Sequence, residues 1–316
     1  MKLLVLGGTG FVGRALVALL VARAGGAGGQ IVVPSRRPQR HKALASLPGV
    51  QLVEADVHDQ GTLVRLLAGC DAVVNLVAIL HGSMAAFERT HVALPRTLAQ
   101  ACRQAAVRRV VHVSALGITA QPPSNYLRSK AAGEAVLSAG GLELTLLRPS
   151  VIFGAEDRFL NLFATMQQLL PLVPLAGAQA RFQPVWVEDV ARAIAACLDD
   201  PGTIGATIEC AGPHVYTLAE LVRLAGNWGG GARPVFPLPD AIGRLQAAAM
   251  SLLPGEPLLS ADNLDSMRVP NIASGTLPGL ERLGITPTAL EAVGPGYLAA
   301  LGTTRLDALR AAGRRR

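Results

Sequence analysis

The sequence predicts an α/β protein with a doubly wound parallel sheet and a smaller mixed lobe toward the C-terminus. Three observations support this class. Short apolar runs alternate with longer amphipathic ones over the first 150 residues, several apolar runs are almost continuous Val, Leu and Ile, and 50% of the 316 residues are hydrophobic. Continuous apolar strands are typical of parallel sheets that helices cover on both faces. This composition excludes a mainly disordered chain.

Strands and helices are expected in alternating order over the first 150 residues. The expected strands are residues 2–6, 30–35, 50–55, 72–77, 109–114 and 143–147. The expected helices are residues 13–24, 42–46, 62–68, 87–106 and 125–138. This alternation implies right-handed crossovers that bring each strand back parallel to the previous one.

The chain becomes less regular after residue 150, where proline is frequent. Short strands are expected at 185–187 and 207–210, and a helix at 188–198 begins with acidic residues, which suit the positive end of a helix dipole. We therefore expect one domain at 1–150. Residues 151–316 are expected to add the remaining sheet elements and a small substrate or partner lobe.

Charge and cysteine usage narrow the classes of function. The net charge is +7, but the basic clusters have no interleaved aromatic residues and no accompanying motif, so nucleic acid is not an expected partner. The basic residues 314–316 are expected to be a solvated tail, with attraction to an acidic membrane or partner as the alternative. The four cysteines form no CxxC pair, so we expect no metal site and a reducing compartment.

The hydropathy pattern gives an expected location. No apolar run reaches the roughly 18–20 residues that span a bilayer, and the apolar start of the chain is broken by glycines before a signal peptide could be complete. We expect a cytoplasmic protein, with a peripheral position at the inner face of the membrane as the alternative.

A glycine-rich turn, GGTGFVG, joins the first strand to the first helix. Gly7, Gly10 and Gly13 let the chain turn sharply, approach a pyrophosphate and pack the helix against the sheet. The strand–turn–helix context is the one that a dinucleotide site requires, so residues 1–150 are predicted to be an NAD(P)-binding Rossmann-type domain. A glycine turn without a ligand is the alternative. The residues expected to contact the cofactor here are Gly7, Thr9, Gly10, Phe11, Val12 and Gly13.

The end of the second strand predicts which nucleotide binds. Ser35, Arg36 and Arg37 stand where a site that prefers NAD usually has Asp or Glu for the ribose 2′-hydroxyl. Guanidinium groups suit a 2′-phosphate by charge and by bidentate geometry. We therefore expect NADP(H) in preference to NAD(H), with a solvated basic loop as the alternative.

Two more strand ends are expected beside the cofactor. Asp56 and Val57 follow the third strand, where a carboxylate can accept a hydrogen bond from the adenine amino group. Asp56 serves equally well as a helix or turn cap for the segment at 59–67. The backbone that ends the fourth strand should border the cofactor. This segment comprises Leu76, Val77 and Ala78.

Tyr126 and Lys130 form a YxxxK spacing on the helix expected at 125–138. The i,i+4 offset places the phenol and the ammonium on one helix face, where the positive charge lowers the pKa of the tyrosine. The chain has only three Tyr and three Lys, so chance gives such a pair about 0.03 times. Ser114, at the end of the fifth strand, can hydrogen-bond a carbonyl or hydroxyl beside Tyr126, or serve only as a cap.

Together these motifs resemble the extended or atypical short-chain dehydrogenase/reductases of the NAD-dependent epimerase/dehydratase kind, over about residues 1–200. The run RPSVIFG at 148–154 adds to the resemblance. The resemblance implies that Tyr126 is the acid/base, that Lys130 assists it and also binds the cofactor with Tyr126, and that Ser114 orients the substrate. It extends the cofactor-binding set to Pro149 and Val151.

Residues 73–80 are similar to a narrower branch, which contains the NADPH-holding accessory subunit of mitochondrial complex I and its bacterial relatives. In that branch the nucleotide is thought to be structural. His91 departs from the wider pattern, since many relatives have Asn there, and is expected to be a polar core or cofactor-side residue. The apolar stretches 169–178, 236–238 and 247–253 fit a packing surface, an apolar substrate pocket or a docking face for a membrane partner.

Two functions therefore stay open. The first is an NADP(H)-dependent oxidoreductase or epimerase-like enzyme, acting on the carbonyl or hydroxyl group of a hydrophobic small molecule. The second is a non-catalytic NADPH-binding accessory or assembly factor of a respiratory membrane complex, related to complex I or to quinone chemistry.

Overall fold

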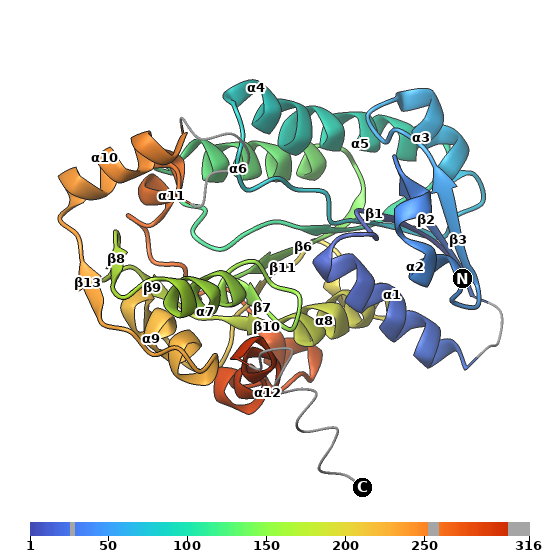
Figure 1. Ribbon diagram of the computed structural model, residues 1–316. Helices are drawn as coiled ribbons and strands as arrows, with labels where there is room; N and C mark the ends of the chain where they lie inside the picture. Colours follow the sequence, from blue (N-terminus) through green and yellow to red (C-terminus); the bar gives the residue numbers. More distant parts are fainter. Residues whose placement is uncertain (26–28, 252–258, 303–316) are drawn as a thin grey trace, which may run out of the picture. The chain divides into compact units, whose positions relative to one another are not determined.

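A seven-stranded parallel sheet forms the centre of the first of two units in the computed structural model, which describes residues 1–25, 29–251 and 259–302 (Figure 1). Unit 1 consists of Met1–Ser150, Val187–Ala211 and Ala273–Pro287, and unit 2 of the other described residues. The strand order is β11-β6-β5-β4-β1-β2-β3. The predicted doubly wound sheet is therefore confirmed, and its order reverses between β1 and β4, where open α/β sheets bind their ligands.

The strands agree closely with the apolar runs of the sequence. Leu4 of β1 lies opposite Val32 and Val73, and all three side chains are buried. The predicted fourth strand is two residues too long, because the side chain of Asn75 accepts the N–H of Val77 at 3.2 Å and ends the ladder. The strands of this sheet are β1 (Lys2–Leu6), β2 (Gln30–Ser35), β3 (Val50–Glu54), β4 (Ala72–Asn75), β5 (Arg109–Val113), β6 (Glu143–Pro149) and β11 (Thr207–Cys210).

Helices cover both faces of this sheet. Figure 1 shows α3, α5 and α6 above it and α1 and α8 below it, and α1 packs on α8 while α5 packs on α3 and α6. The helices of unit 1 are α1 (Phe11–Ala24), α2 (Lys42–Ala45), α3 (Gln60–Leu67), α4 (Met84–Phe87), α5 (Leu94–Gln104), α6 (Asn125–Ser138) and α8 (Val187–Asp199), with short turns η1 (Pro38–Arg40), η3 (Pro201–Thr203) and η4 (Leu280–Leu283).

The segment predicted as one helix at 87–106 is helical up to residue 104, but it is not a uniform α-helix. The chain forms α4, then a π-helical turn, η2 (Glu88–Ala93), and then α5. A π turn holds one residue more than an α turn and is frequent at functional sites. The amphipathic period of the sequence does not reveal this extra residue.

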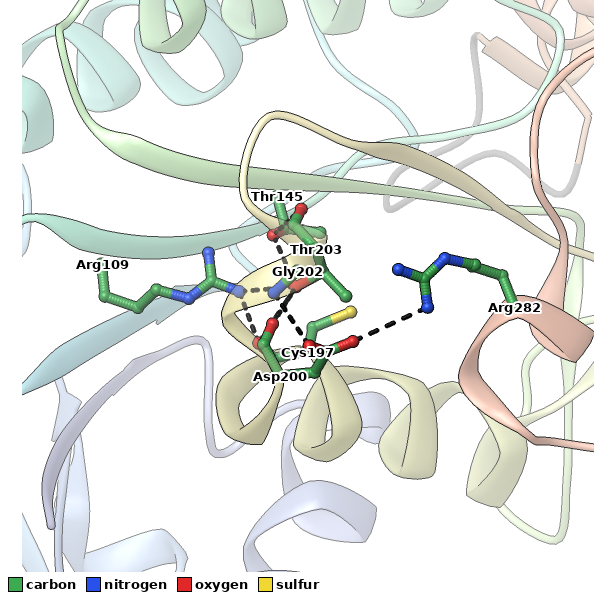
Figure 2. A network of polar contacts seen from close by, with 7 residues as sticks. All are labelled: Arg109, Thr145, Cys197, Asp200, Gly202, Thr203 and Arg282. Atoms are coloured by element: carbon green, nitrogen blue, oxygen red, sulfur yellow. Dashed lines mark hydrogen bonds and ion pairs between the residues drawn. The ribbon is translucent and has the colours of Figure 1, made fainter.

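Arg109 joins the sheet of unit 1 to the C-terminal end of α8 (Figure 2). Its guanidinium, at the start of β5, donates to the carbonyl oxygen of Glu143 at 2.8 Å, to that of Cys197 and to the hydroxyl of Thr203 at 3.1 Å. The hydroxyl of Thr145 in β6 donates to the carbonyl of Thr203 at 2.7 Å. Helix-end carbonyls that lack a partner within the helix are thereby satisfied.

Unit 2 has its own apolar core around Phe153, Leu160, Leu221 and Leu290. Its helices are α7 (Leu160–Leu169), α9 (Leu218–Trp228), α10 (Asp240–Ser251), α11 (Ala261–Ser266) and α12 (Leu290–Gly302). Its strands pair in twos: β7 (Ile152–Phe153) with β10 (Val185–Trp186), β9 (Arg181–Phe182) with β12 (Tyr216–Thr217), and β8 (Val173–Leu175) with β13 (Val235–Pro237).

The apolar stretches of the C-terminal part divide into buried and exposed residues. Val173 and Ala247 are buried, whereas Leu169 is 77% and Phe236 56% exposed, so these two do not belong to a packed core. Residues 252 and 253 and the basic tail 314–316 lie outside the described residues. None of the helices within the described ranges is long and apolar enough to span a bilayer.

Candidate nucleotide and catalytic site

The glycine turn has the close packing that its sequence predicts. Gly7 has φ 78°, a left-handed conformation that favours glycine. A Cβ on residue 13 would lie 2.4 Å from the carbonyl oxygen of Gly7, so only glycine fits there. Gly10 begins α1 without a side-chain cap, and Arg14 braces the turn by donating to the carbonyl of Thr9 at 2.7 Å. The first N–H groups of α1 are therefore not capped by the Gly10 position and suit an anion.

The end of β4 lies directly against this turn. A Cβ on Gly7 would be 3.1 Å from the carbonyl carbon of Leu76, and the Leu76 N–H donates to Leu6 at 2.9 Å. Asn75 is buried and donates to Nδ1 of His112 at 3.1 Å. The structure thus brings Leu76 against the glycine turn, and Val77 follows in the same segment.

The ends of β2 and β3 carry exposed charge. Arg36 and Arg37 are exposed, and the hydroxyl of Ser35 accepts the N–H of Arg37 at 3.2 Å. Asp56 is also exposed; it accepts the N–H of His58 at 3.0 Å and pairs with Arg89 at 3.9 Å.

Of the two cap alternatives for Asp56, the structure supports the turn cap, through the N–H of His58, and contradicts the helix cap. Asp59 caps α3 by accepting the N–H of Thr62 at 2.7 Å. Arg89 was missed by sequence reasoning, because it lies on η2, far from Asp56 in sequence. Burial, Arg89 and, to a smaller extent, Arg36 lower the pKa of His58, so positive charge gathers at this corner of the sheet.

The candidate catalytic side chains come from β5 and α6. Ser124 caps α6 by accepting the N–H of Leu127 at 3.1 Å, which fixes Tyr126 and Lys130 in the first turns of the helix. Lys130 is 2% exposed, and its Nζ donates to the carbonyl of Val113 at 2.9 Å. Ser114 follows directly, and its Oγ is buried without a hydrogen-bond partner among the described residues. A buried hydroxyl of this kind calls for a ligand or water.

The protonation of this group differs from the sequence expectation. We expected Lys130 to lower the pKa of Tyr126, but burial raises it to about 12. Burial also lowers the pKa of Lys130 to about 8, against the opposing effect of Glu134. Spacing on a helix predicts proximity, whereas the pKa depends on desolvation, which the spacing does not contain. Near neutral pH the tyrosine is therefore a phenol and most of the lysine is charged.

A buried ion pair that the sequence did not predict supports α6. Glu134 accepts two hydrogen bonds from the guanidinium of Arg148, at 2.9 and 2.5 Å. The side chains are 7% and 19% exposed, so the pair is poorly screened by solvent. It fixes α6 against β6 one turn beyond Lys130.

Pro149 and Val151, the last residues predicted to contact the cofactor, lie in different units. The carbonyl of Pro149 accepts the N–H of Leu116 at 2.9 Å in unit 1. Val151 belongs to unit 2, where its N–H donates to the side chain of Asn271 at 2.9 Å. Val151 therefore lies in a different unit from the other residues predicted to contact the cofactor.

Comparison with known proteins decides the family. Residues 7–201 match a family described as NAD(P)H-binding. The chain belongs to this family. The mouse (Mus musculus) mitochondrial protein NADH dehydrogenase (ubiquinone) 1 alpha subcomplex subunit 9 is 34% identical over 294 residues, which cover 91% of this chain and 77% of the mouse protein. The Arabidopsis thaliana protein of the same name is 30% identical over 305 residues, covering 91% and 74%.

Solved structures of other proteins share the fold. A dTDP-glucose 4,6-dehydratase from Streptomyces venezuelae has a TM-score of 0.74 and 24% identity, covering 94% of this chain and 96% of that chain. An NADPH-dependent quinone oxidoreductase from Escherichia coli, complexed with NADPH, has a TM-score of 0.73 and 22% identity, covering 94% and 99%. The expected resemblance to the extended short-chain dehydrogenase/reductases, and to their branch with the complex I subunit, is confirmed.

Proposed function

We propose that this chain binds NADP(H) and uses Tyr126, Lys130 and Ser114 to reduce the carbonyl group of an apolar substrate. The observation that carries the proposal is the buried Ser114 hydroxyl, which has no partner in the described part of the chain and follows the strand end that holds Lys130. A substrate oxygen placed there would satisfy it. The close contact of Gly7 with Leu76 supports a dinucleotide beside the same sheet edge.

The preference for NADP(H) rests on charge. Arg36 and Arg37 are exposed at the end of β2, and Arg89 adds a third guanidinium near Asp56. A 2′-phosphate would be attracted by this group of cations, and the bidentate geometry of arginine suits phosphate oxygens.

Each catalytic side chain has one role in this proposal. Bound NADPH supplies a hydride to the substrate carbon. Tyr126 is a phenol near neutral pH because burial raises its pKa to about 12, so it can donate its proton to the carbonyl oxygen. Lys130 presents a positive charge held by the carbonyl of Val113. The Ser114 hydroxyl donates a hydrogen bond that orients the same oxygen.

NADPH oxidation in the presence of apolar ketones and quinones tests this proposal. We expect Tyr126→Phe to lower the rate by about 100-fold or more, since the proton donor is lost. Tyr216→Phe is the matched control, because the Tyr216 hydroxyl bonds Glu291 in unit 2 and has no role in the chemistry. Equal rates for the Tyr126→Phe variant and the parent protein would exclude the mechanism.

A second function is favoured by the sequence identity with the NADH dehydrogenase subunits. In this alternative the chain is an accessory or assembly factor that retains NADPH without turnover, at the inner face of the membrane. Exposed Leu169, Phe236 and Leu245 in unit 2 suit a partner or an apolar substrate equally. Gentle solubilisation of membranes, followed by affinity purification and mass spectrometry, tests it: a respiratory complex should co-purify, and a chain recovered without partners would contradict it.

A further inference from the structure

His91 connects two segments of the proposed nucleotide site. Its Nε2 accepts the backbone N–H of Ile79 at 3.1 Å, in the loop that follows β4. Its Nδ1 lies 2.8 Å from the hydroxyl of Ser129 on α6. Ser129 in turn donates to the carbonyl oxygen of Tyr126 at 2.7 Å. The loop after β4 and the first turn of α6 are therefore joined through one imidazole and one hydroxyl.

One arrangement of protons satisfies this whole chain. Ser129 uses its hydrogen toward Tyr126, so its oxygen accepts from Nδ1–H of His91. Nε2 must then be unprotonated, and it accepts the Ile79 N–H. Burial, and secondly the charge of Lys130, lower the pKa of His91 to about 3, so the ring keeps this neutral form near neutral pH. The imidazole is 3% exposed.

The backbone at His91 lies very close to the backbone of α6. The π-helical turn η2 carries the residue, and a Cβ on Gly133 of α6 would lie 2.0 Å from the carbonyl oxygen of His91. The ring is stacked on Phe87 and meets the ring of Tyr126 edge to face, each with 5.6 Å between centroids. Backbone contact on one side and ring contact on the other fix the orientation of the imidazole.

We propose that His91 is a positioning residue, which sets the spacing between the loop after β4 and Tyr126 and so determines where a bound nicotinamide lies relative to the phenol. This inference rests on the proposed nucleotide function. The glycine turn contacts Leu76, three residues before Ile79, so a nucleotide bound at that turn would adjoin the loop that His91 holds. Ser129 is the second member of the connection.

Variants of His91 and Ser129 separate this role from general packing. His91→Phe keeps an aromatic ring between Phe87 and Tyr126 but removes both ring nitrogens. Ser129→Ala removes only the hydroxyl, and the double variant removes both. The measurement is the fluorescence emission of NADPH bound to the full-length protein, which reports the surroundings of the reduced nicotinamide.

We expect each single variant to bind NADPH within about threefold of the parent affinity, because the glycine turn is intact. The emission spectrum of the bound nucleotide should move toward that of free NADPH, by a similar amount in His91→Phe and in the double variant. His91→Gln, which can still accept the Ile79 N–H, should restore part of the parent spectrum. An unchanged spectrum in His91→Phe, or effects of the two single variants that simply add, would overturn the proposal.

The same measurements distinguish failure of the proposed NADPH binding from failure of the positioning role. If the parent protein does not bind NADPH, the proposed function is wrong, and the positioning role falls with it. If the parent binds NADPH and His91→Phe leaves its emission unchanged, only the positioning role is wrong. If His91→Phe does not fold, the emission spectrum of NADPH bound to Ser129→Ala tests the positioning role instead. This variant deletes a single oxygen and so disturbs the packing little.

Discussion

The backbone of Gly13 approaches Gly7 so closely that a Cβ on residue 13 would lie 2.4 Å from the Gly7 carbonyl oxygen. Gly13→Ala must therefore displace either the turn or α1. We expect NADPH affinity to fall by at least about tenfold, measured by titration of NADPH fluorescence. Gly296→Ala is the matched helical control, because a Cβ there meets nothing within 4 Å. Similar affinities for both variants would contradict the packing argument.

The two arginines after β2 should select the nucleotide. We expect Arg36→Ala/Arg37→Ala to weaken NADPH binding by about tenfold or more, since charge-assisted hydrogen bonds to the 2′-phosphate are lost, while NADH affinity changes little. Parallel titrations with both nucleotides measure this. Arg96→Ala, which removes an exposed arginine on α5, should leave the ratio unchanged. A parent protein with equal affinities for NADH and NADPH would exclude this selection.

Burial of His91 should make the fold sensitive to acid. Its pKa is about 3 in the folded protein and ordinarily 6.5, so between these values the unfolded chain binds a proton that the folded chain does not. The free energy of unfolding should thus fall as the pH is lowered below 6.5, with His91 contributing up to about 1.4 kcal/mol per pH unit. His112, whose pKa burial also lowers, adds in the same direction.

Denaturant titrations at several pH values between about 4 and 7 measure this slope. His91→Phe should give a shallower slope than the parent protein, whatever its stability at neutral pH. If the two slopes are equal, His91 is not held neutral by the fold.

Arg109 should stabilise unit 1 far more than its neighbour does. Arg109→Met removes a hydrogen-bond donor from the carbonyls of Glu143 and Cys197 and from the hydroxyl of Thr203. We expect a loss of about 2–4 kcal/mol in the free energy of unfolding. Arg108→Met is the matched control: its side chain is 73% exposed and pairs with Glu143 at 3.2 Å, so about 0.5 kcal/mol or less is expected. Equal losses of unfolding free energy in the two variants would show that the hydrogen bonds of Arg109 stabilise unit 1 no more than the exposed ion pair of Arg108.

Features that depend on local spacing could be predicted from the sequence. The strands follow from apolar runs, and Tyr126 and Lys130 share a helix face because four residues make about one turn. The glycine turn is equally local. These patterns are sufficient for the fold class and for the choice of candidate residues.

Features that depend on contacts between distant residues could not be predicted in this way. Arg109 meets Thr203, and Glu134 meets Arg148, only after the sheet has formed. The role of His91 depends on one additional residue in a π turn, which leaves no mark in the hydrophobic period. The pKa of Tyr126 depends on burial, which its sequence neighbours do not determine.

The connectivity of unit 1 affects folding during synthesis, because the N-terminal segments leave the ribosome before the segments that cover them. When residue 150 emerges, β6 has no neighbour on its outer edge, since β11 is made only at Thr207–Cys210. The helix α1, which carries the buried residues Leu16 and Val17, also still lacks α8, the helix on which it packs in the finished protein. An open strand edge and an uncovered apolar helix invite pairing with other chains. A nascent or truncated chain that stops near residue 150 should therefore need chaperone protection until the later segments arrive.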